Sequence, residues 1–262
     1  MRKIKAVILD WAGTLVDYGC MASEENYREI FAEFNINLTK KEIRNKMGIK
    51  KLDHIRYILE SDRVSKLWFK NTGIEANEGD VRELNRRFES KIFEKVEKHS
   101  EPKEYVIRTL EILRESGIRI GSTTSYSSDV MEFLTKISKQ KGLYVDYWAN
   151  SEQVNGQGRP NPFMIFKNME KMGIGSVQNV IKVGDTINDI KEGINAGVTT
   201  VAIVDGSSEM GLSLAEFESL DENEQNKARL EVRNKFKKAG ADYIVNNFSS
   251  IPYLIAQIEN KN

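Results

Sequence analysis

Aspartate and threonine side chains follow three short apolar segments of the sequence. Asp10 comes directly after one segment, Thr123 and Thr124 stand at the end of a second, and Asp185 follows a third. Short apolar runs of this kind are typical of buried parallel strands, and ligands bind beyond the carboxyl ends of such strands. We therefore expect these side chains to meet at one edge of a sheet.

A metal-assisted attack on phosphorus is the chemistry that this set favours. Asp10 and Asp185 would repel each other unless a cation lay between them, and Mg²⁺ prefers oxygen ligands, including substrate phosphate oxygens. The cation would allow a carboxylate to attack phosphorus and form an aspartyl-phosphate. Thr124 would donate to a phosphoryl oxygen, and Arg159, in the Gly-Arg-Pro segment at 158–160, would add a fixed positive charge.

Each of these residues has a plainer interpretation when it is taken alone. An aspartate after a strand is often a helix cap, a pair of threonines carries little information, and Gly-Arg-Pro is commonly a turn. The ordered set is far more specific than any of its members. It predicts a site for phosphoryl transfer.

The order Asp10, Thr124, Arg159 and then Asp185 with Asp189 resembles the four motifs of the haloacid dehalogenase superfamily. In most phosphatases of that superfamily, a second aspartate stands two residues after the nucleophile. It protonates the leaving oxygen and later activates water. The resemblance implies that Asp10 is the nucleophile.

Ala12 occupies the position of that second aspartate. An ordinary phosphate ester would lose a general acid, a contribution of about 10²–10⁴-fold. In the cleavage of a carbon–phosphorus bond the leaving group is a carbanion, which needs an electron sink instead. A lysine that condenses with a neighbouring aldehyde supplies one, because the protonated imine becomes an enamine when phosphorus leaves.

The segments 10–14, 16–20 and 47–56 resemble the phosphonoacetaldehyde hydrolase (phosphonatase) family, and the likeness extends along nearly the whole chain. It implies hydrolysis of phosphonoacetaldehyde to acetaldehyde and phosphate, with Lys51 as the imine-forming lysine. It also implies Mg²⁺ held by Asp10, the backbone carbonyl of Ala12 and Asp185, with Asp189 in support, and a homodimer. The residues that it places against the small-molecule phosphonate substrate are Cys20, Met47, His54, Thr124, Ser125, Tyr126 and Arg159. Ser125 departs from the glycine that is usual there.

Lys51 also has an interpretation that is independent of the family. Met47, Lys51 and His54 are spaced four and three residues apart, so they share one face of a predicted helix. A lysine has an ordinary pKa of ~10.4, and efficient attack on an aldehyde requires a pKa lowered by about 2–3 units, which burial would supply. The alternative is a solvated surface lysine, one of 39 cationic residues.

The order of segments predicts an α/β fold with a Rossmann-like doubly wound parallel sheet and an inserted helical cap domain. We expect a cap at residues 20–98, where apolar residues recur at helical spacing, and a catalytic core at 1–19 and 99–262. Strands are expected at 4–9, 118–122, 144–148, 179–183, 199–204 and 243–245. Helices are expected at 24–35, 40–98, 103–116, 127–141, 162–172 and 188–196, within 213–239, and at the end of the chain.

The composition narrows the classes of partner. The 262 residues contain 39 Lys+Arg and 39 Asp+Glu, and this balance gives no general attraction to nucleic acid or to an anionic membrane. No apolar run approaches the roughly 20 residues of a membrane span. The single cysteine, Cys20, excludes an intrachain disulfide, so we expect a cytoplasmic protein.

Two other functions remain open on the sequence. The same scaffold could carry a phosphate-ester phosphatase or a phosphomutase, which Ala12 disfavours. A catalytically silent module that binds a phosphonate is the second alternative, and the presence of Asp10, Asp185 and Lys51 disfavours it.

Overall fold

A six-stranded parallel sheet forms the centre of the molecule, described by a computed structural model over residues 3–260. The strand order β3-β2-β1-β4-β5-β6 places β1 beside β2 and β4, so the carboxyl ends of these three strands are neighbours. The strands are β1 (Ala6–Leu9), β2 (Arg119–Thr124), β3 (Tyr147–Asn150), β4 (Val180–Gly184), β5 (Thr199–Ile203) and β6 (Tyr243–Val245).

Helices cover both faces of the sheet because successive strand residues point in opposite directions. In β1, Ala6 and Ile8 pack into one apolar cluster with Ile165 of α8, whereas Val7 and Leu9 pack into another that includes residues of α6, α7 and α12. The expected doubly wound sheet is therefore confirmed. These helices are α6 (Val106–Glu115), α7 (Ser128–Gln140), α8 (Phe163–Met172), α9 (Ile187–Ala196), α10 (Leu214–Glu218), α11 (Glu222–Ala239) and α12 (Ile251–Asn260).

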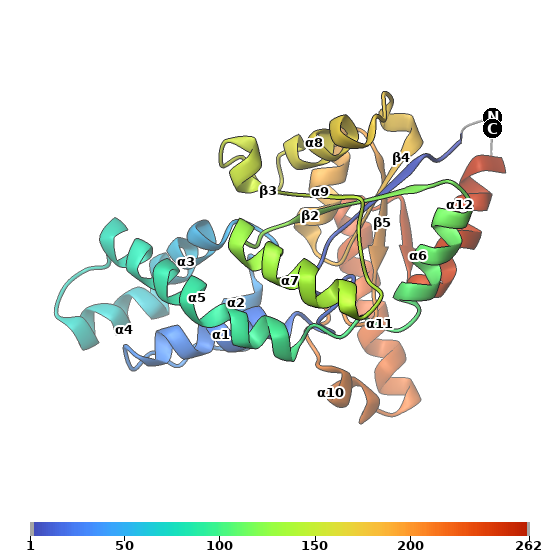
Figure 1. Cartoon of the computed structure of the whole chain (residues 1–262). Coiled ribbons are helices and arrows are strands. Elements are labelled where there is room, and N and C mark those ends of the chain that lie inside the picture. Colours follow the sequence, from blue (N-terminus) through green and yellow to red (C-terminus); the bar gives the residue numbers. More distant parts are fainter. Residues whose placement is uncertain (1–2, 261–262) are drawn as a thin grey trace.

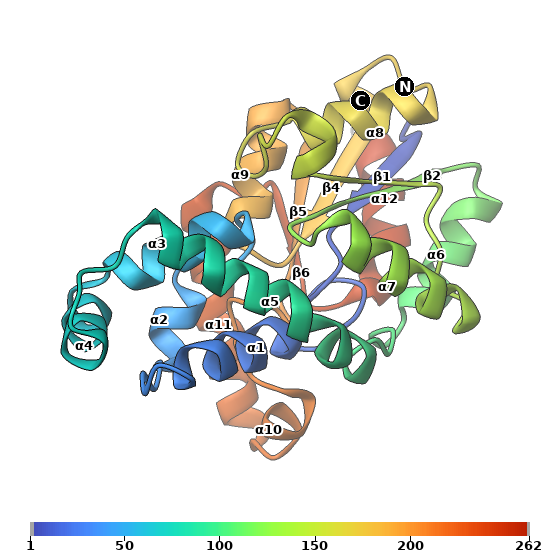
Figure 2. The same ribbon diagram turned by 60° about the vertical axis from the view of Figure 1, so that its left-hand side comes forward.

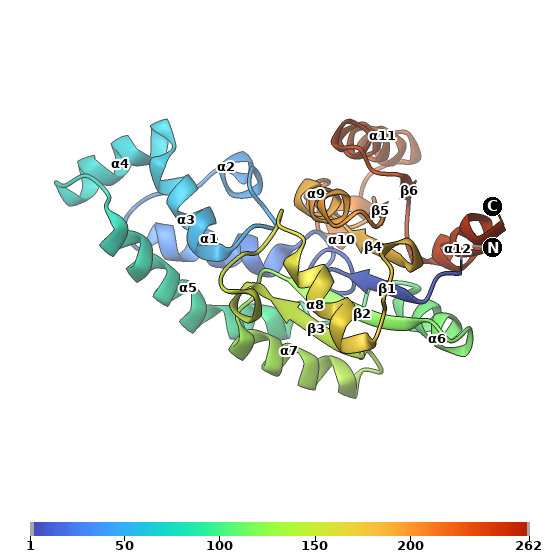
Figure 3. The same ribbon diagram turned by 90° about the horizontal axis from the view of Figure 1, so that it is seen from above.

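Five further helices lie to one side of the sheet, beyond the carboxyl ends of its strands (Figures 1 and 2). Capping boxes begin two of them, with Thr39 and Glu42 at α2 and Asn77 and Asp80 at α5. Seen from above, this helical unit extends away from the helices that flank the sheet (Figure 3). The five are α1 (Met21–Ala32), α2 (Lys40–Arg44), α3 (Lys51–Glu60), α4 (Asp62–Thr72) and α5 (Glu78–Lys98).

Some sequence-based boundaries were wrong. The third strand begins at Tyr147, three residues later than expected. Helix α3 begins at Lys51, so Met47 precedes it and does not share a helical face with Lys51 and His54. Gly48 ends the preceding turn at φ +88°, a left-handed conformation that a continuous helix cannot contain. Residues 1–2 and 261–262 of the expected core lie outside the described residues.

Within residues 3–260, none of the helices has both the length and the apolar character required to cross a bilayer.

Candidate active site

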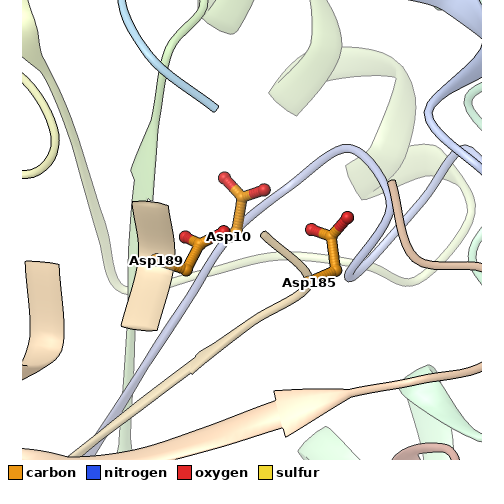
Figure 4. Close-up of side chains that lie close together, drawn as sticks. All are labelled: Asp10, Asp185 and Asp189. Carbon is orange, nitrogen blue, oxygen red and sulfur yellow. The ribbon is translucent and has the colours of Figure 1, made fainter. Parts of the chain in front are cut away.

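Three aspartate carboxylates meet at the carboxyl edge of the sheet (Figure 4). Asp10 follows β1, Asp185 follows β4, and Asp189 lies in the first turn of α9. They are buried, and the oxygens that they offer lie within 4.8 Å of one another. The convergence of strand ends expected from the sequence is therefore present.

The loop after Asp10 packs directly against Asp185. Gly13 has φ +85°, and a Cβ at this position would lie 2.1 Å from a carboxylate oxygen of Asp185, so only glycine fits. Thr14 Oγ1 donates to Asp185 Oδ1 at 2.8 Å, and the backbone N–H of Ser208 donates to Oδ2 at 2.7 Å. These bonds hold the Asp185 carboxylate beside the Asp10 loop.

Burial disfavours the ionised forms of two carboxyls of this cluster, Asp10 and Asp185. It raises the pKa of Asp10, and burial together with the charges of Asp10 and Asp189 raises the pKa of Asp185 to about 8. A bound cation would remove this penalty. Within residues 3–260, no donor bonds to the backbone carbonyl of Ala12, which leaves that oxygen free as a ligand. The donor set therefore fits a metal ion that prefers oxygen.

Asp189 has a different environment from the other two aspartates. Thr186 Oγ1 donates to its Oδ2 at 2.6 Å, while its Oδ1 lies 2.9 Å from Lys182 Nζ and 3.3 Å from Arg159 Nη2. Although burial opposes ionisation, the charges of Arg159 and Lys182 lower the pKa of Asp189. Asp189 therefore orders the two cations beneath the cluster.

A buried network of charges lies beneath Asp10. Arg159 Nη2 donates to Asp10 Oδ1 at 2.6 Å and to the backbone carbonyl of Thr123 at 2.6 Å, and its Nε donates to Glu192 Oε2 at 3.1 Å. Lys182 Nζ lies 3.1 Å from the same Glu192 oxygen and donates to Thr123 Oγ1 at 2.7 Å. Arg159 is thus fixed against the predicted nucleophile.

Lys182 and Glu192 were not singled out from the sequence. Lys182 carried a signal, because it interrupts the otherwise apolar run Val180 to Val183. Glu192 follows Asp189 by three residues on α9, so the two share a helical face, but a glutamate at that spacing is common on solvated helices.

Lys51 projects from the first turn of α3 into the same enclosed cavity as Asp10. Its amine is buried and donates to Ser23 Oγ at 3.1 Å. Burial is the main cause that lowers the pKa of Lys51, and the charges of Glu89 and Asp10 partly oppose it. The buried position of Lys51 thus lowers its pKa in the direction that efficient attack of the amine on an aldehyde requires.

The cavity brings together most of the predicted substrate-contacting residues. It has about 20 Å³ of free space, room for roughly one water molecule. Burial raises the pKa of Cys20 to about 12, so this side chain is a neutral thiol. The lining residues are Asp10, Ala12, Cys20, Met47, Gly48, Lys51, Thr124, Ser125, Tyr126, Arg159, Thr186 and Ser208.

His54 is absent from the cavity wall. It packs behind Lys51, with its ring centroid 4.6 Å from that of Tyr27, and it is fully buried. Burial and the nearby charge of Lys51 lower the pKa of His54 to about 3, so the imidazole is neutral at physiological pH. In this closed structure His54 is therefore not one of the residues that line the cavity, and the substrate contact expected from the sequence stays a prediction.

Polar contacts fasten the helical unit to the sheet edge around this cavity. Arg44 Nη1 donates to the backbone carbonyl of Ser208 at 3.0 Å, and Asn188 Nδ2 donates to the carbonyl of Met47 at 2.7 Å. Ser127 Oγ donates to Glu89 at 2.6 Å on the opposite side. The two parts are therefore closed over the aspartates.

A larger hollow of about 640 Å³ lies between α3, α4 and α5, far along the helical unit. Arg56 on its rim is already paired with Asp53 and Glu78. Among the described residues this hollow gathers no set of groups suited to catalysis, so chemistry and not size identifies the active site.

Comparison with known proteins agrees with this geometry. Residues 7–203 match the family described as haloacid dehalogenase-like hydrolase. The chain is 43% identical over 259 residues to the phosphonoacetaldehyde hydrolase of Lysinibacillus sphaericus, covering 99% of this chain and 96% of that protein. It is 42% identical over 260 residues to the bifunctional phosphonoacetaldehyde hydrolase/aminoethylphosphonate transaminase of Clostridioides difficile, covering 99% of this chain but only 41% of that longer protein.

A solved structure gives a similar result. The crystal structure of a phosphonoacetaldehyde hydrolase-like protein from Oleispira antarctica superimposes with a TM-score of 0.96 at 29% identity, covering 98% of this chain and 93% of that one.

Proposed function

This chain belongs to the haloacid dehalogenase-like hydrolase family, and we propose that it hydrolyses the carbon–phosphorus bond of phosphonoacetaldehyde to give acetaldehyde and phosphate. One observation carries the choice of reaction. A buried lysine amine and an aspartate face a common cavity in which Ala12 stands where a general acid for an oxygen leaving group would be. The relatives named for this activity support the same choice.

Lys51 supplies the electron sink in this proposal. Its free amine adds to the aldehyde carbon, and loss of water leaves a protonated imine. When the carbon–phosphorus bond breaks, its electron pair moves into the imine and gives an enamine. Protonation at carbon and hydrolysis then release acetaldehyde and restore the amine.

Asp10 receives the phosphoryl group. Its carboxylate attacks phosphorus in line with the departing carbon, and water later hydrolyses the aspartyl-phosphate to phosphate. Arg159, which already touches Asp10, and Thr124 stabilise the charge on the phosphoryl oxygens. Mg²⁺ would be held by Asp10, the Ala12 carbonyl and Asp185, and when bound it would neutralise both the nucleophile and the phosphonate dianion.

We propose that the helical residues 20–98 act as a cap on a core made of the rest of the chain. The cavity has about 20 Å³ of space, too little for the substrate, so the contacts made by Arg44 and Asn188 must open before binding. His54 lies behind Lys51, where its ring packs α3, the helix that carries the lysine, against Tyr27 of α1. On the family resemblance we further propose a homodimer in the cytoplasm.

The test is a comparison of substrates. Purified protein with Mg²⁺ should release phosphate from phosphonoacetaldehyde, and a panel of phosphate monoesters should give little release. Chelation with EDTA should abolish the activity, and added Mg²⁺ should restore it. Faster turnover of phosphate esters would reject carbon–phosphorus cleavage in favour of a phosphatase, and ligand binding without any phosphate release would favour a binding module.

A further inference from the structure

Ser23 lies against the amine of Lys51. It is the third residue of α1 and is fully buried, and its Oγ accepts a hydrogen bond from Lys51 Nζ at 3.1 Å. In the part of the chain that the structure describes, this is the one hydrogen-bond partner of the amine. No pattern in the sequence marks Ser23, because its place beside the amine follows from the contact of α1 with α3.

The other neighbours of the amine are aromatic rings. Lys51 Nζ lies 5.0 Å from the ring centroid of Tyr126, 5.5 Å from that of Phe88 and 5.9 Å from that of Tyr27. The face of a ring attracts a cation, but the attraction does not select one rotation about the Cε–Nζ bond. A hydrogen-bond acceptor does restrict this rotation, because it takes one N–H and leaves the lone pair of the free amine only the two remaining staggered directions.

We propose that Ser23 is a positioning residue for Lys51: its hydroxyl takes one N–H of the amine and turns the nitrogen lone pair toward the aldehyde carbon. This inference rests on the proposed function, because it concerns the lysine that forms the imine. Ser23 is not among the residues that line the cavity.

The surroundings of Ser23 make it a rigid support. Asp17 accepts from the backbone N–H groups of Met21 at 2.7 Å and Ala22 at 3.0 Å, which ties the first turn of α1 to the end of the nucleophile loop. Ser23 Oγ also lies 3.5 Å from Tyr126 Oη, a residue of the sheet edge. The hydroxyl therefore contacts the lysine of the helical unit and a tyrosine of the core at once.

Reductive labelling isolates this step. Acetaldehyde with cyanoborohydride labels a lysine that forms an imine, and acetaldehyde has no phosphoryl group, so Asp10 and Arg159 take no part. The label on the Lys51 peptide would be followed over time by mass spectrometry. Ser23→Ala should lower the labelling rate roughly 10- to 100-fold while the final extent of labelling stays complete, because orientation and not folding is lost.

Ser138→Ala is the matched control. Ser138 is also fully buried, but its hydroxyl makes no hydrogen bond and lies in α7 away from the cavity. This variant should label at the wild-type rate. Labelling of Ser23→Ala at the wild-type rate would overturn the inference, and so would an equal slowing in both variants.

The pH profile gives a second readout, because a general loss of packing would hydrate the amine and move the midpoint to higher pH, whereas loss of the Ser23 acceptor moves it the other way. The Ser23 oxygen favours the ammonium form, so Ser23→Ala should shift the midpoint of the labelling profile to lower pH. The other titratable groups near the amine, which are Cys20, Glu89, Asp10 and Arg159, are unchanged in that variant. An unchanged midpoint would overturn the inference. If the wild-type protein acquires no label at Lys51 from any aldehyde, the proposed function fails instead.

Discussion

Replacing Lys182 by methionine should destabilise the protein strongly, although the side chain is remote from the substrate. The amine lies in the middle of β4 with 0% exposure, 2.9 Å from Asp189 Oδ1, 3.1 Å from Glu192 Oε2 and 2.7 Å from Thr123 Oγ1. Methionine keeps a similar length and removes the charge. Two buried carboxylates would then lose a counterion that no water can replace.

The magnitude follows from that burial. Removing one partner of a buried ion pair costs about 3–5 kcal/mol, a large part of the 5–15 kcal/mol by which a typical domain is stable. For a chain of this size the melting temperature should fall by roughly 10 °C. Urea unfolding monitored by circular dichroism, with the slope checked for two-state behaviour, measures the loss directly.

The pH dependence has a defined sign. The charges of Arg159 and Lys182 hold the pKa of Asp189 below its ordinary value of 3.8 despite burial. A carboxyl with a depressed pKa contributes stability above its ordinary pKa, and the contribution is lost as the pH falls through the folded value. The gap between wild type and Lys182→Met should therefore be full at pH 7 and narrow below about pH 4.

Lys167→Met is the control, because Lys167 pairs with Glu170 on the exposed surface of α8 at 2.8 Å. Solvent screens that pair, so the unfolding midpoint should stay at the wild-type value. If Lys182→Met were no more destabilising than this control, or if the gap widened on acidification, the assignment of the buried charge network would be refuted.

Three further outcomes follow from the site. Because the pKa of Asp185 is raised to about 8, its contribution to the stability of the metal-free protein should be lost as the pH rises through that value. Mg²⁺ should bind about tenfold more tightly per pH unit between pH 6 and 8, with release of a proton. Calorimetry in two buffers checks this, and an affinity that does not change with pH would contradict it. Arg159→Lys should lower kcat by roughly 10²-fold in phosphate-release kinetics, because the single amine of a lysine cannot replace the contacts of both Nη2 and Nε. The same variant should still label Lys51 with acetaldehyde at the wild-type rate. Burial raises the pKa of Cys20 to about 12, so iodoacetamide at pH 8 should leave the thiol unmodified until urea unfolds the chain, and rapid alkylation of the folded protein would show that the cavity is open.

The sheet was predictable because its strands carry local signals. The apolar segment before Asp10 and the short run Tyr243–Val245 read as strands, and both form. The site aspartates converge because parallel strands carry their carboxyl ends to one edge, a rule that needs no knowledge of side-chain packing. Asp10 and Asp185 were therefore identified from the sequence.

The remaining parts depend on contacts between segments that are distant in the sequence. Ser23 touches Lys51 only because α1 packs beside α3, and no local pattern marks that serine. His54 was expected against the substrate from the family resemblance, and it lies behind Lys51 instead, because helical spacing fixes a face but not the depth at which that face is buried. Gly48 carried a signal that Met47 lies outside the helix, since glycine favours the left-handed turn observed there.

In the proposed reaction one amine of the helical unit, that of Lys51, becomes covalently bound to the substrate. Borohydride reduction in the presence of phosphonoacetaldehyde, followed by peptide mass mapping, detects this bond. We predict a two-carbon adduct confined to the peptide that contains Lys51, together with loss of activity in proportion to labelling. A label on any other lysine, or continued turnover with no label at all, would contradict the lysine-imine mechanism.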